Sequence, residues 1–441
     1  MSSQDSPASF GAIGVEPPVL SVASSTASIV FEWVALLPLG IYLASNRLPH
    51  RLVGQTALTG HVPIALFPRL GVLGTLADFL QQGQDFFDRA SSVNDLRRKV
   101  WDVNWGSIFP CANGAVAAIL SAHALRRVKA QKVPEDVDQI PGSNRSFEPL
   151  KPESPFRRYQ KLNILRFTKT SENATHVGCL WRGFPVALEV FLLIGLLGIN
   201  VICFLFGLYG TATAVFLALL LRISRQLMVI ERPSGYLRNN EGDKPGCMLV
   251  SLHENASSWD LYVGSRGIID TILNKTMVQD VKSSLGVWHA YGLRTLEGLQ
   301  ILIMTYAAAQ KGWDGVALLS LVVVAWVIDS ITYNNDRTAA QWLRREGVRV
   351  DATTLEFSGR TPMIGTIHAL GSQRSTTWMD GILTPSSRRD VWLRKLACKE
   401  VDPSFEKGLS VGDKEWVDLN ERLTLVAHAM IPPDVIAETS S

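Results

Sequence analysis

Two short segments of the chain carry residue types that could bind a metal ion or move a proton. The first contains His253 and Asp260, and the second contains His368 and Asp380. Two imidazoles with carboxylates form a donor set for a transition metal, and the same groups serve as general acids and bases. Neither segment has closely spaced ligands, so such a site would require both segments to meet in the fold. The alternative is that these histidines lie in loops and hydrogen-bond to the backbone.

One acidic residue, Glu32, interrupts an otherwise apolar stretch over residues 20–44. An ionisable group inside a membrane helix is costly to bury, and this makes Glu32 a candidate for function. The structural alternative is an ion pair with Arg69. The catalytic residues are therefore unknown, and the candidates are Glu32, His253, Asp260, His368 and Asp380.

No motif predicts a cofactor or a resident metal ion. The chain has no Walker A sequence, no G-x-S-x-G sequence and no C-x-x-C pair. Asn335-Asp336 lacks the further acidic residues of a magnesium diphosphate site, so we interpret it as part of a helix cap. Gly264-Ser-Arg-Gly267 is interpreted as a turn rather than an anion-binding nest. Cys111 and Cys203 lie in apolar stretches and are expected to be small buried apolar residues.

Hydropathy predicts the elements that must position these residues. The 441 residues have a mean hydropathy of +0.14, and 19% are charged, against about 25% in an ordinary soluble domain. Charged residues are absent over long continuous stretches of the sequence, and this pattern is typical of membrane helices. The net charge is only +3, which excludes a global basic field, so we expect no nucleic-acid partner.

Two apolar hairpins are predicted, one formed by residues 184–206 and 209–228 and one over residues 296–328. Three further candidate spans precede them, at residues 20–44, 57–77 and 106–125. The expected fold class is mainly α: a polytopic α-helical membrane protein with a cytosolic α+β loop and C-terminal region. We expect about seven spans, or six if residues 57–77 do not cross, because Pro63, Pro68 and Arg69 disfavour that segment.

The predicted segments alternate between membrane and cytosol. They are a disordered N-terminus over 1–19, an N-terminal membrane region over 20–125, a Pro- and charge-rich cytosolic linker over 126–182, a helical hairpin over 184–228, a cytosolic loop domain over 229–292, a second hairpin over 294–331 and a cytosolic C-terminal region over 334–441.

Basic residues near the helix ends predict the orientation in the membrane. Segments 126–182, 222–292 and 334–441 are rich in Lys and Arg, which indicates that they are cytosolic. The N-terminus is then outside or lumenal and the C-terminus cytosolic, in a membrane that the sequence does not identify. The expected partners are the lipid bilayer and proteins at the cytosolic face. Four sequons are expected to carry no sugar, at Asn144, Asn173, Asn255 and Asn274.

The cytosolic segments contain helix caps and one repeated pattern. Asn334 is predicted to cap a helix that ends at Gly347, and Thr384-Pro385 to begin another. The apolar run 248–253 matches the run 363–368 in residue class, and each is followed by a Trp–Asp pair. An isolated strand leaves its backbone groups unpaired, so we predict that the two runs pair in one small sheet.

Two longer segments, residues 259–277 and 377–393, include Trp259-Asp-Leu-Tyr-Val-Gly-Ser-Arg-Gly267 and Thr377-Trp-Met-Asp-Gly-Ile-Leu-Thr-Pro385. They resemble segments of a group of multi-pass membrane proteins from filamentous fungi that has no assigned activity. The resemblance implies a fungal source and a link to specialised metabolism, and it carries over no catalytic residue. The function expected from the sequence is an accessory or interaction protein. The alternatives are a membrane-embedded enzyme acting on a lipophilic substrate and a transporter.

Overall fold

The computed structural model describes most of the chain between residues 25 and 436. The described ranges are 25–44, 49–82, 97–134, 159–170, 179–228, 244–275, 284–310, 313–371, 375–397 and 408–433, with short stretches at 230, 235–237, 277 and 435–436. At 25–29, 31–32, 49–50, 179–188 and 284–286 only the backbone is described. The segment 1–19 and the sequons at Asn144 and Asn173 lie outside these ranges.

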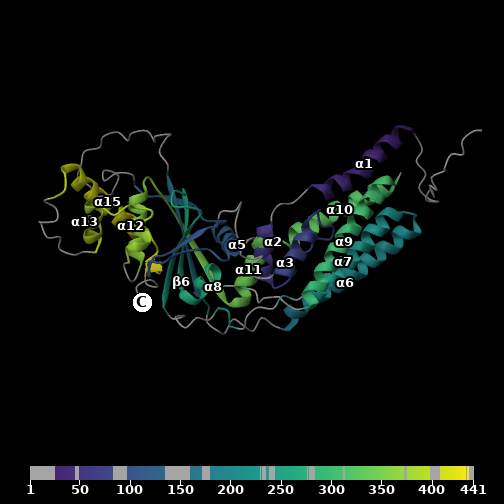
Figure 1. The fold of residues 1–441 in the computed structure, drawn as a ribbon, viewed down its shortest axis with the longest axis horizontal. Helices are drawn as coiled ribbons and strands as arrows, with labels where there is room; N and C mark the ends of the chain where they lie inside the picture. The colour runs from purple at the N-terminus through teal and green to yellow at the C-terminus, as the bar shows by residue number, and fades with distance from the viewer. Residues whose placement is uncertain are drawn as a thin grey trace, which may run out of the picture.

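A seven-stranded mixed β-sheet occupies the middle of the molecule (Figure 1). The order of the strands is β2-β1-β5-β6-β4-β7-β3. β4 is parallel to β6 and β3 is parallel to β7, whereas the other neighbours are antiparallel. The strands are β1 (Lys99–Asp102), β2 (Ile108–Pro110), β3 (Ala130–Lys132), β4 (Gln160–Lys169), β5 (Pro245–Ser251), β6 (Ser258–Ser265) and β7 (Val348–Phe357).

The longest pairing in the sheet joins β4 to β7. The two strands run antiparallel from Gln160 opposite Phe357 to Lys169 opposite Val348. β4 is apolar on both faces because helices cover both faces of the sheet, and it buries Leu162 and Phe167 on opposite sides. This strand lies in the segment 126–182, for which the sequence predicts a linker, and that prediction does not hold for β4.

Helices cover the sheet on both sides and form two separate cores (Figure 1). On the first side α5 (Gly114–Leu125) and α8 (Arg266–Leu273) pack over Phe167 and Tyr262, next to α2 (Pro49–Thr59) and α11 (Asn335–Glu346). On the second side α12 (Arg360–Leu370), the short helix η3 (Thr377–Met379), α13 (Ser387–Leu396) and α15 (Val411–Ala429) pack over Trp101 and Trp259.

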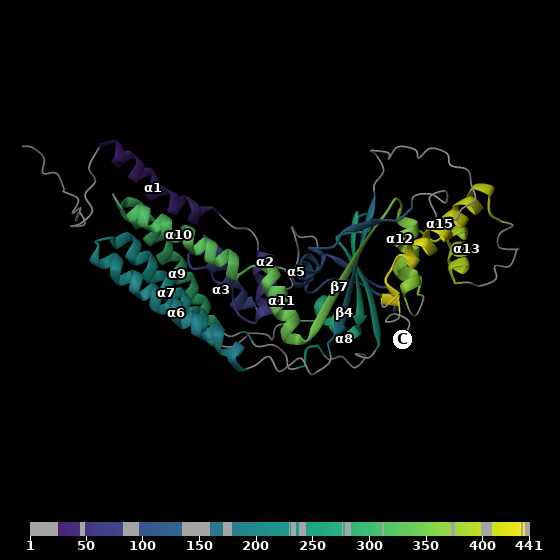
Figure 2. The same ribbon diagram turned by 180° about the vertical axis from the view of Figure 1, so that it is seen from behind.

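Five long helices extend away from the first side of the sheet (Figure 2). They are α1 (Ser25–Leu43), α6 (Cys179–Leu205), α7 (Tyr209–Leu227), α9 (Ser284–Ala309) and α10 (Trp313–Thr332). We call these helices the apolar bundle, its end near the sheet the base and its far end the tip. α6 pairs with α7, α7 with α9, and α1 with α10, while the shorter α3 (Val72–Gln82) packs along α9.

The prediction of a mainly α protein with about seven spans is wrong. The chain has a mixed α/β architecture, and in the described residues one helical stretch, Trp313–Glu346, is long and apolar enough to cross a membrane; it comprises α10 and α11. Helical hairpins do form at the two predicted places, as α6 with α7 and as α9 with α10. Part of the error came from the N-terminal candidate spans, and the rest from the strands of the central sheet, which the sequence did not predict as one sheet.

Two of the predicted N-terminal spans are parts of the folded core. Residues 106–125 form β2 and α5, and α5 is apolar on every side because it is buried against the sheet and α2. Residues 57–77 form the end of α2, a loop and the start of α3. In this loop the carbonyl of Pro68 accepts a hydrogen bond from buried Gln300 of α9, so neighbouring protein satisfies the non-helical backbone.

The predicted pairing of the runs 248–253 and 363–368 is also wrong. Residues 248–251 belong to β5, which pairs with β1 and β6, but residues 363–368 lie inside α12. A short, fully buried apolar run has no periodicity that separates a strand from a helix. The predicted helix start at Thr384-Pro385 is wrong as well, because α13 begins at Ser387 with Ser386 as its N-cap. The two ends of α11 were predicted correctly. Asn334 accepts a hydrogen bond from the amide of Asp336 at the start of α11, and Gly347 ends that helix in the left-handed conformation at φ 64°.

Candidate functional site

The outer surface of the apolar bundle carries most of the exposed large apolar side chains of the described chain. Examples with more than half of their surface exposed are Trp33 on α1, Phe191 and Leu205 on α6, Leu302 on α9 and Trp326 on α10. The largest apolar patch on a typical soluble monomer covers about 300–600 Å², and larger patches mark protein or membrane contacts. The bundle is therefore the first candidate for a functional surface.

Small residues let the helices of the bundle approach one another closely. A Cβ atom on Gly315 would lie 2.5 Å from the Cα of Ala35, and one on Gly210 would lie 3.0 Å from the Cα of Ala307. Neither glycine can carry a side chain without moving a backbone. Such contacts between small residues are typical of helices that associate in lipid, where packing replaces the hydrophobic driving force.

A cluster of charged side chains lies at the base of the bundle. Arg222 of α7 donates two hydrogen bonds to Glu189 of α6, at 2.8 and 2.9 Å, and Arg225 donates a third at 3.2 Å. Both arginines also donate to the hydroxyl of Tyr333, which itself donates to the carbonyl of Ile64. We call Glu189, Arg222, Arg225 and Tyr333 the base cluster. It joins the bundle to the loop before α3.

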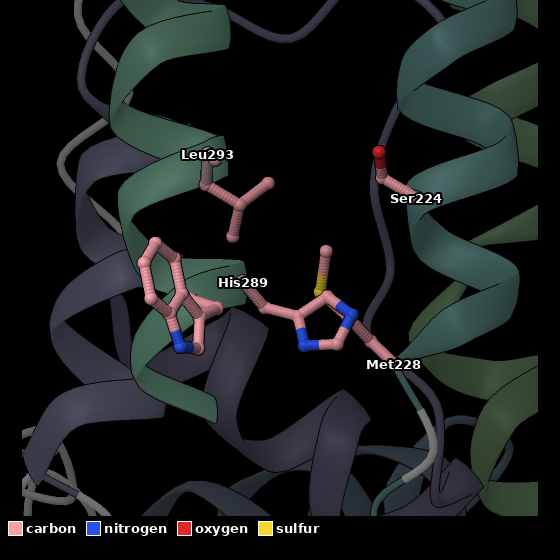
Figure 3. A pocket seen from close by; sticks show the side chains of 6 residues that line it. Ser224, Met228, His289 and Leu293 are labelled. Atoms are coloured by element: carbon pink, nitrogen blue, oxygen red, sulfur yellow. The ribbon is translucent and has the colours of Figure 1, made fainter. Parts of the chain in front are cut away.

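A pocket opens beside the base cluster, between the end of α7 and the beginning of α9 (Figure 3). Its volume is about 310 Å³, and its lining residues are Ser224, Met228, Trp288, His289, Gly292 and Leu293. His289 reaches from α9 towards Met228, the residue that follows α7, and Leu293 points towards Ser224 across the gap between the helices (Figure 3). The described lining is mostly apolar, and its polar groups are one imidazole, one hydroxyl and the indole N–H of Trp288.

A second group of polar side chains surrounds Asp260, between the sheet and α5. The Asp260 carboxylate accepts hydrogen bonds from Asn163 at 2.8 Å and from Arg98 at 3.4 Å. Ser121 of α5 lies 3.4 Å from the same carboxylate and 2.7 Å from the hydroxyl of Tyr262. We call these five residues the Asp260 cluster.

The groups near Asp260 that could transfer protons or act as nucleophiles are held in their neutral forms. Burial, and then the charge of Asp260, raises the pKa of the Tyr262 hydroxyl. Burial also raises the pKa of the nearby Cys111 thiol to about 11. A thiol becomes nucleophilic only as the thiolate, so Cys111 is inert near neutral pH. The Asp260 cluster therefore fits a role in holding α5 against the sheet.

The structure separates the other residues that the sequence proposed. His253 is exposed in the loop after β5, and its Nδ1 atom accepts a hydrogen bond from the amide of Asn255. His368 is buried within α12. Asp380 pairs with Arg389 of α13 on the second side of the sheet, while Asp260 faces α5 on the first. Among the residues in the described ranges, no three His, Cys, Asp or Glu side chains form a metal-binding group.

Two further acidic residues of the bundle, Glu297 on α9 and Asp329 on α10, contact the loop between α2 and α3. Glu297 accepts a hydrogen bond from the amide of Gly71, and Asp329 accepts one from the amide of Leu66. Both carboxylates therefore hold the loop between α2 and α3 against the bundle. The side chain of Glu32 is outside the described residues, so its proposed pair with Arg69 stays a prediction.

Comparisons with protein-family models, with curated proteins and with solved structures found no match to this chain.

Sequence reasoning missed the pocket and the base cluster for a geometric reason. Ser224 and His289 lie on helices that belong to different hairpins, so no sequence spacing relates them. Arg222 and Glu189 are also 33 positions apart, although the charge-free stretch between them did predict the hairpin that brings them together. An arginine at the end of one apolar arm facing a glutamate at the start of the other is the signal that could have indicated an ion pair across the hairpin.

Proposed function

We propose that this chain is a membrane-embedded accessory or interaction protein, with the apolar bundle in the lipid bilayer and the sheet domain presented to protein partners. The observation that carries the proposal is the exposed apolar surface of the bundle. Burying one large apolar side chain is worth about 1.5–3 kcal/mol. The bundle exposes dozens of such side chains, so transfer of its surface from water into lipid is strongly favourable.

The positions of the charged residues in the bundle support an arrangement in which the sheet domain lies on one side of the membrane. Between Glu189 and Arg222 no residue is charged, and the base cluster that these two residues form lies next to the sheet domain. At the tip, the Asp314 carboxylate is buried and is satisfied by hydrogen bonds from Gly210 and Thr211. The base therefore fits the boundary between hydrocarbon and headgroups, and the tip fits the far side of the membrane.

All seven strands lie beyond the base (Figure 2). Each hairpin leaves the base and returns to it, so the sheet domain needs to occupy only one side of the bilayer. The basic residues of 222–292 and 334–441 favour the cytosol for that side. The tip of the bundle and the N-terminal end of α1 are then lumenal or external.

Alkaline extraction and glycosylation mapping in microsomes test this proposal. We expect the chain to stay in the membrane pellet in alkaline carbonate. A flexible loop with an N-x-T sequon, inserted between Gly207 and Leu208 at the tip, should gain sugar, whereas the native Asn255 and Asn274 should not. Release of the chain by carbonate would overturn the membrane assignment. Sugar on Asn255 with none at the tip would reverse the orientation and leave the embedding intact.

A further inference from the structure

We infer that the pocket between α7 and α9 binds a neutral lipid with a hydroxyl head, such as a sterol, drawn from the leaflet next to the sheet domain. The inference rests on the proposed embedding of the bundle. It goes beyond that proposal because it assigns a specific ligand site to one place on the lipid-facing surface.

The pocket is continuous with the apolar surface that the bilayer would cover. Trp288, which lines it, is 74% exposed, and Tyr291 one turn further along α9 is 56% exposed. On the other wall, Ile223 precedes Ser224 and is 44% exposed. A lipid could therefore enter sideways from the bilayer without crossing water. Trp and Tyr are also the side chains that prefer headgroup depth, which is where the neighbouring base cluster places this pocket.

The polar groups of the pocket favour a hydroxyl over a phosphate. The Ser224 hydroxyl can both donate and accept hydrogen bonds, and none of the described lining residues is an arginine, a lysine or a carboxylate. The nearest arginines along α7, Arg222 and Arg225, donate to Glu189 and Tyr333. Among the described lining residues a phosphate would meet no cation that could replace its hydration, whereas a hydroxyl needs only one donor and one acceptor.

The size of the pocket fits part of a lipid rather than a whole one. Its volume of about 310 Å³ is at the lower end of the range of roughly 300–1,000 Å³ for small-molecule sites. Met228, Leu293 and Trp288 would contact the apolar part next to the hydroxyl, while His289 and Ser224 lie within the same lining (Figure 3). The remaining hydrocarbon would stay in the bilayer.

Gly292 provides a way to fill the pocket without disturbing the helix. A Cβ atom added to Gly292 meets no heavy atom within 4 Å, so Gly292→Phe places its ring in open space. Gly298 is the matched control, because it is also in α9, is also exposed and would also carry a Cβ with no heavy atom within 4 Å. It is absent from the pocket lining. Either substitution removes a helical glycine, so both variants should fold at least as well as the parent.

The experiment is photo-crosslinking of the full chain in nanodiscs with two diazirine probes, a sterol and a phosphatidylcholine. We expect the sterol probe to label peptides containing residues 288–293 and unlabelled sterol to compete with it. Gly292→Phe should abolish this labelling and Gly298→Phe should leave it unchanged. Ser224→Ala should reduce it about fivefold, as loss of one hydrogen bond would.

The other outcomes separate this inference from the proposed function. Equal labelling of residues 288–293 by the phosphatidylcholine probe, insensitive to Gly292→Phe, would mean ordinary lipid contact and would overturn the site. Labelling of α6 and α10 by both probes with none at 288–293 would overturn the site while leaving the bundle in the membrane. Competition by diacylglycerol as strong as that by sterol would support the hydroxyl-headed class. Absence of labelling on any bundle helix would overturn both the site and the membrane embedding.

Discussion

The carboxylate of Asp314, at the start of α10, accepts a hydrogen bond of 2.7 Å from the backbone amide of Thr211, at the start of α7. The same carboxylate accepts a second hydrogen bond of 2.7 Å from the amide of Gly210. Asp314 is 5% exposed and Thr211 is fully buried. A side chain of one hairpin thus satisfies the free amides at the helix start of the other, and this locks the two hairpins together at the tip.

Asp314→Ala should destabilise the bundle, because it leaves buried amides without an acceptor. Each such group costs about 1–3 kcal/mol, so the thermal midpoint in detergent should fall clearly. Asp314→Asn keeps one acceptor oxygen, so its thermal midpoint should fall less than that of Asp314→Ala. Ser320→Ala, an exposed position on the same helix, should behave as the parent. Equal midpoints for all three variants would show that the contact is not needed to join the hairpins.

Glu189→Gln should weaken the base of the bundle because Arg222, with a side chain 7% exposed, would lose its counter-charge. Removing one partner of a buried ion pair costs about 3–5 kcal/mol, and the partial exposure of Glu189 favours the lower end. The double variant Glu189→Gln with Arg222→Gln should recover part of the loss in a double-mutant cycle. The control is the exposed pair Asp78 and Arg294, where Asp78→Asn should change stability by about 0–1 kcal/mol.

Cys111 and Cys247 should resist alkylation in the folded protein. Both are buried, and burial raises the pKa of Cys111 to about 11 and raises that of Cys247 as well. At pH 8, iodoacetamide should leave both unmodified while it modifies the urea-unfolded chain. Val411→Cys, at a position 76% exposed, provides a reactive thiol as a positive control for peptide mass spectrometry. Rapid native labelling of Cys247 would contradict its place in the core of the sheet.

Mild acid should loosen α15. Burial lowers the pKa of His428 below its ordinary value of 6.5, so the unfolded state binds a proton more readily than the folded state. The contribution of neutral His428 to stability is therefore present above pH 6.5 and decreases as the pH falls from there towards the folded pKa. Hydrogen exchange of residues 411–429 should accelerate between pH 7.5 and 5.5 after correction for intrinsic rates. His428→Gln should remove this acceleration, and exchange in β4 serves as an internal reference.

Local sequence rules predicted the parts of this fold that depend on neighbours in the chain. The cap at Asn334, the stop at Gly347 and the two hairpins depend on a few adjacent residues or on one uncharged run. The sequence failed where burial depends on tertiary contacts. α5 has the composition of a short span, and only its packing under the sheet distinguishes it from one.

The candidate site was less predictable than the fold. Asp260 was selected from its Trp–Asp context, and the structure gives it partners that come from β4, α5 and the residue before β1. The pocket needs Ser224 and His289 to meet across two hairpins, and no local pattern contains that information. His253 and His368 end the two matched apolar runs, yet His368 is buried in a helix and His253 is exposed in a loop.

During translation, β4 cannot pair with β7 until both apolar hairpins have been synthesised. The two strands are joined along ten residues each, and both apolar hairpins lie between them in sequence. β4 has β6 on one edge, so until residue 357 has been synthesised its other edge remains open to unrelated strands. Translation therefore completes both hairpins before the sheet can close. During that interval the fold itself does not cover this edge of β4.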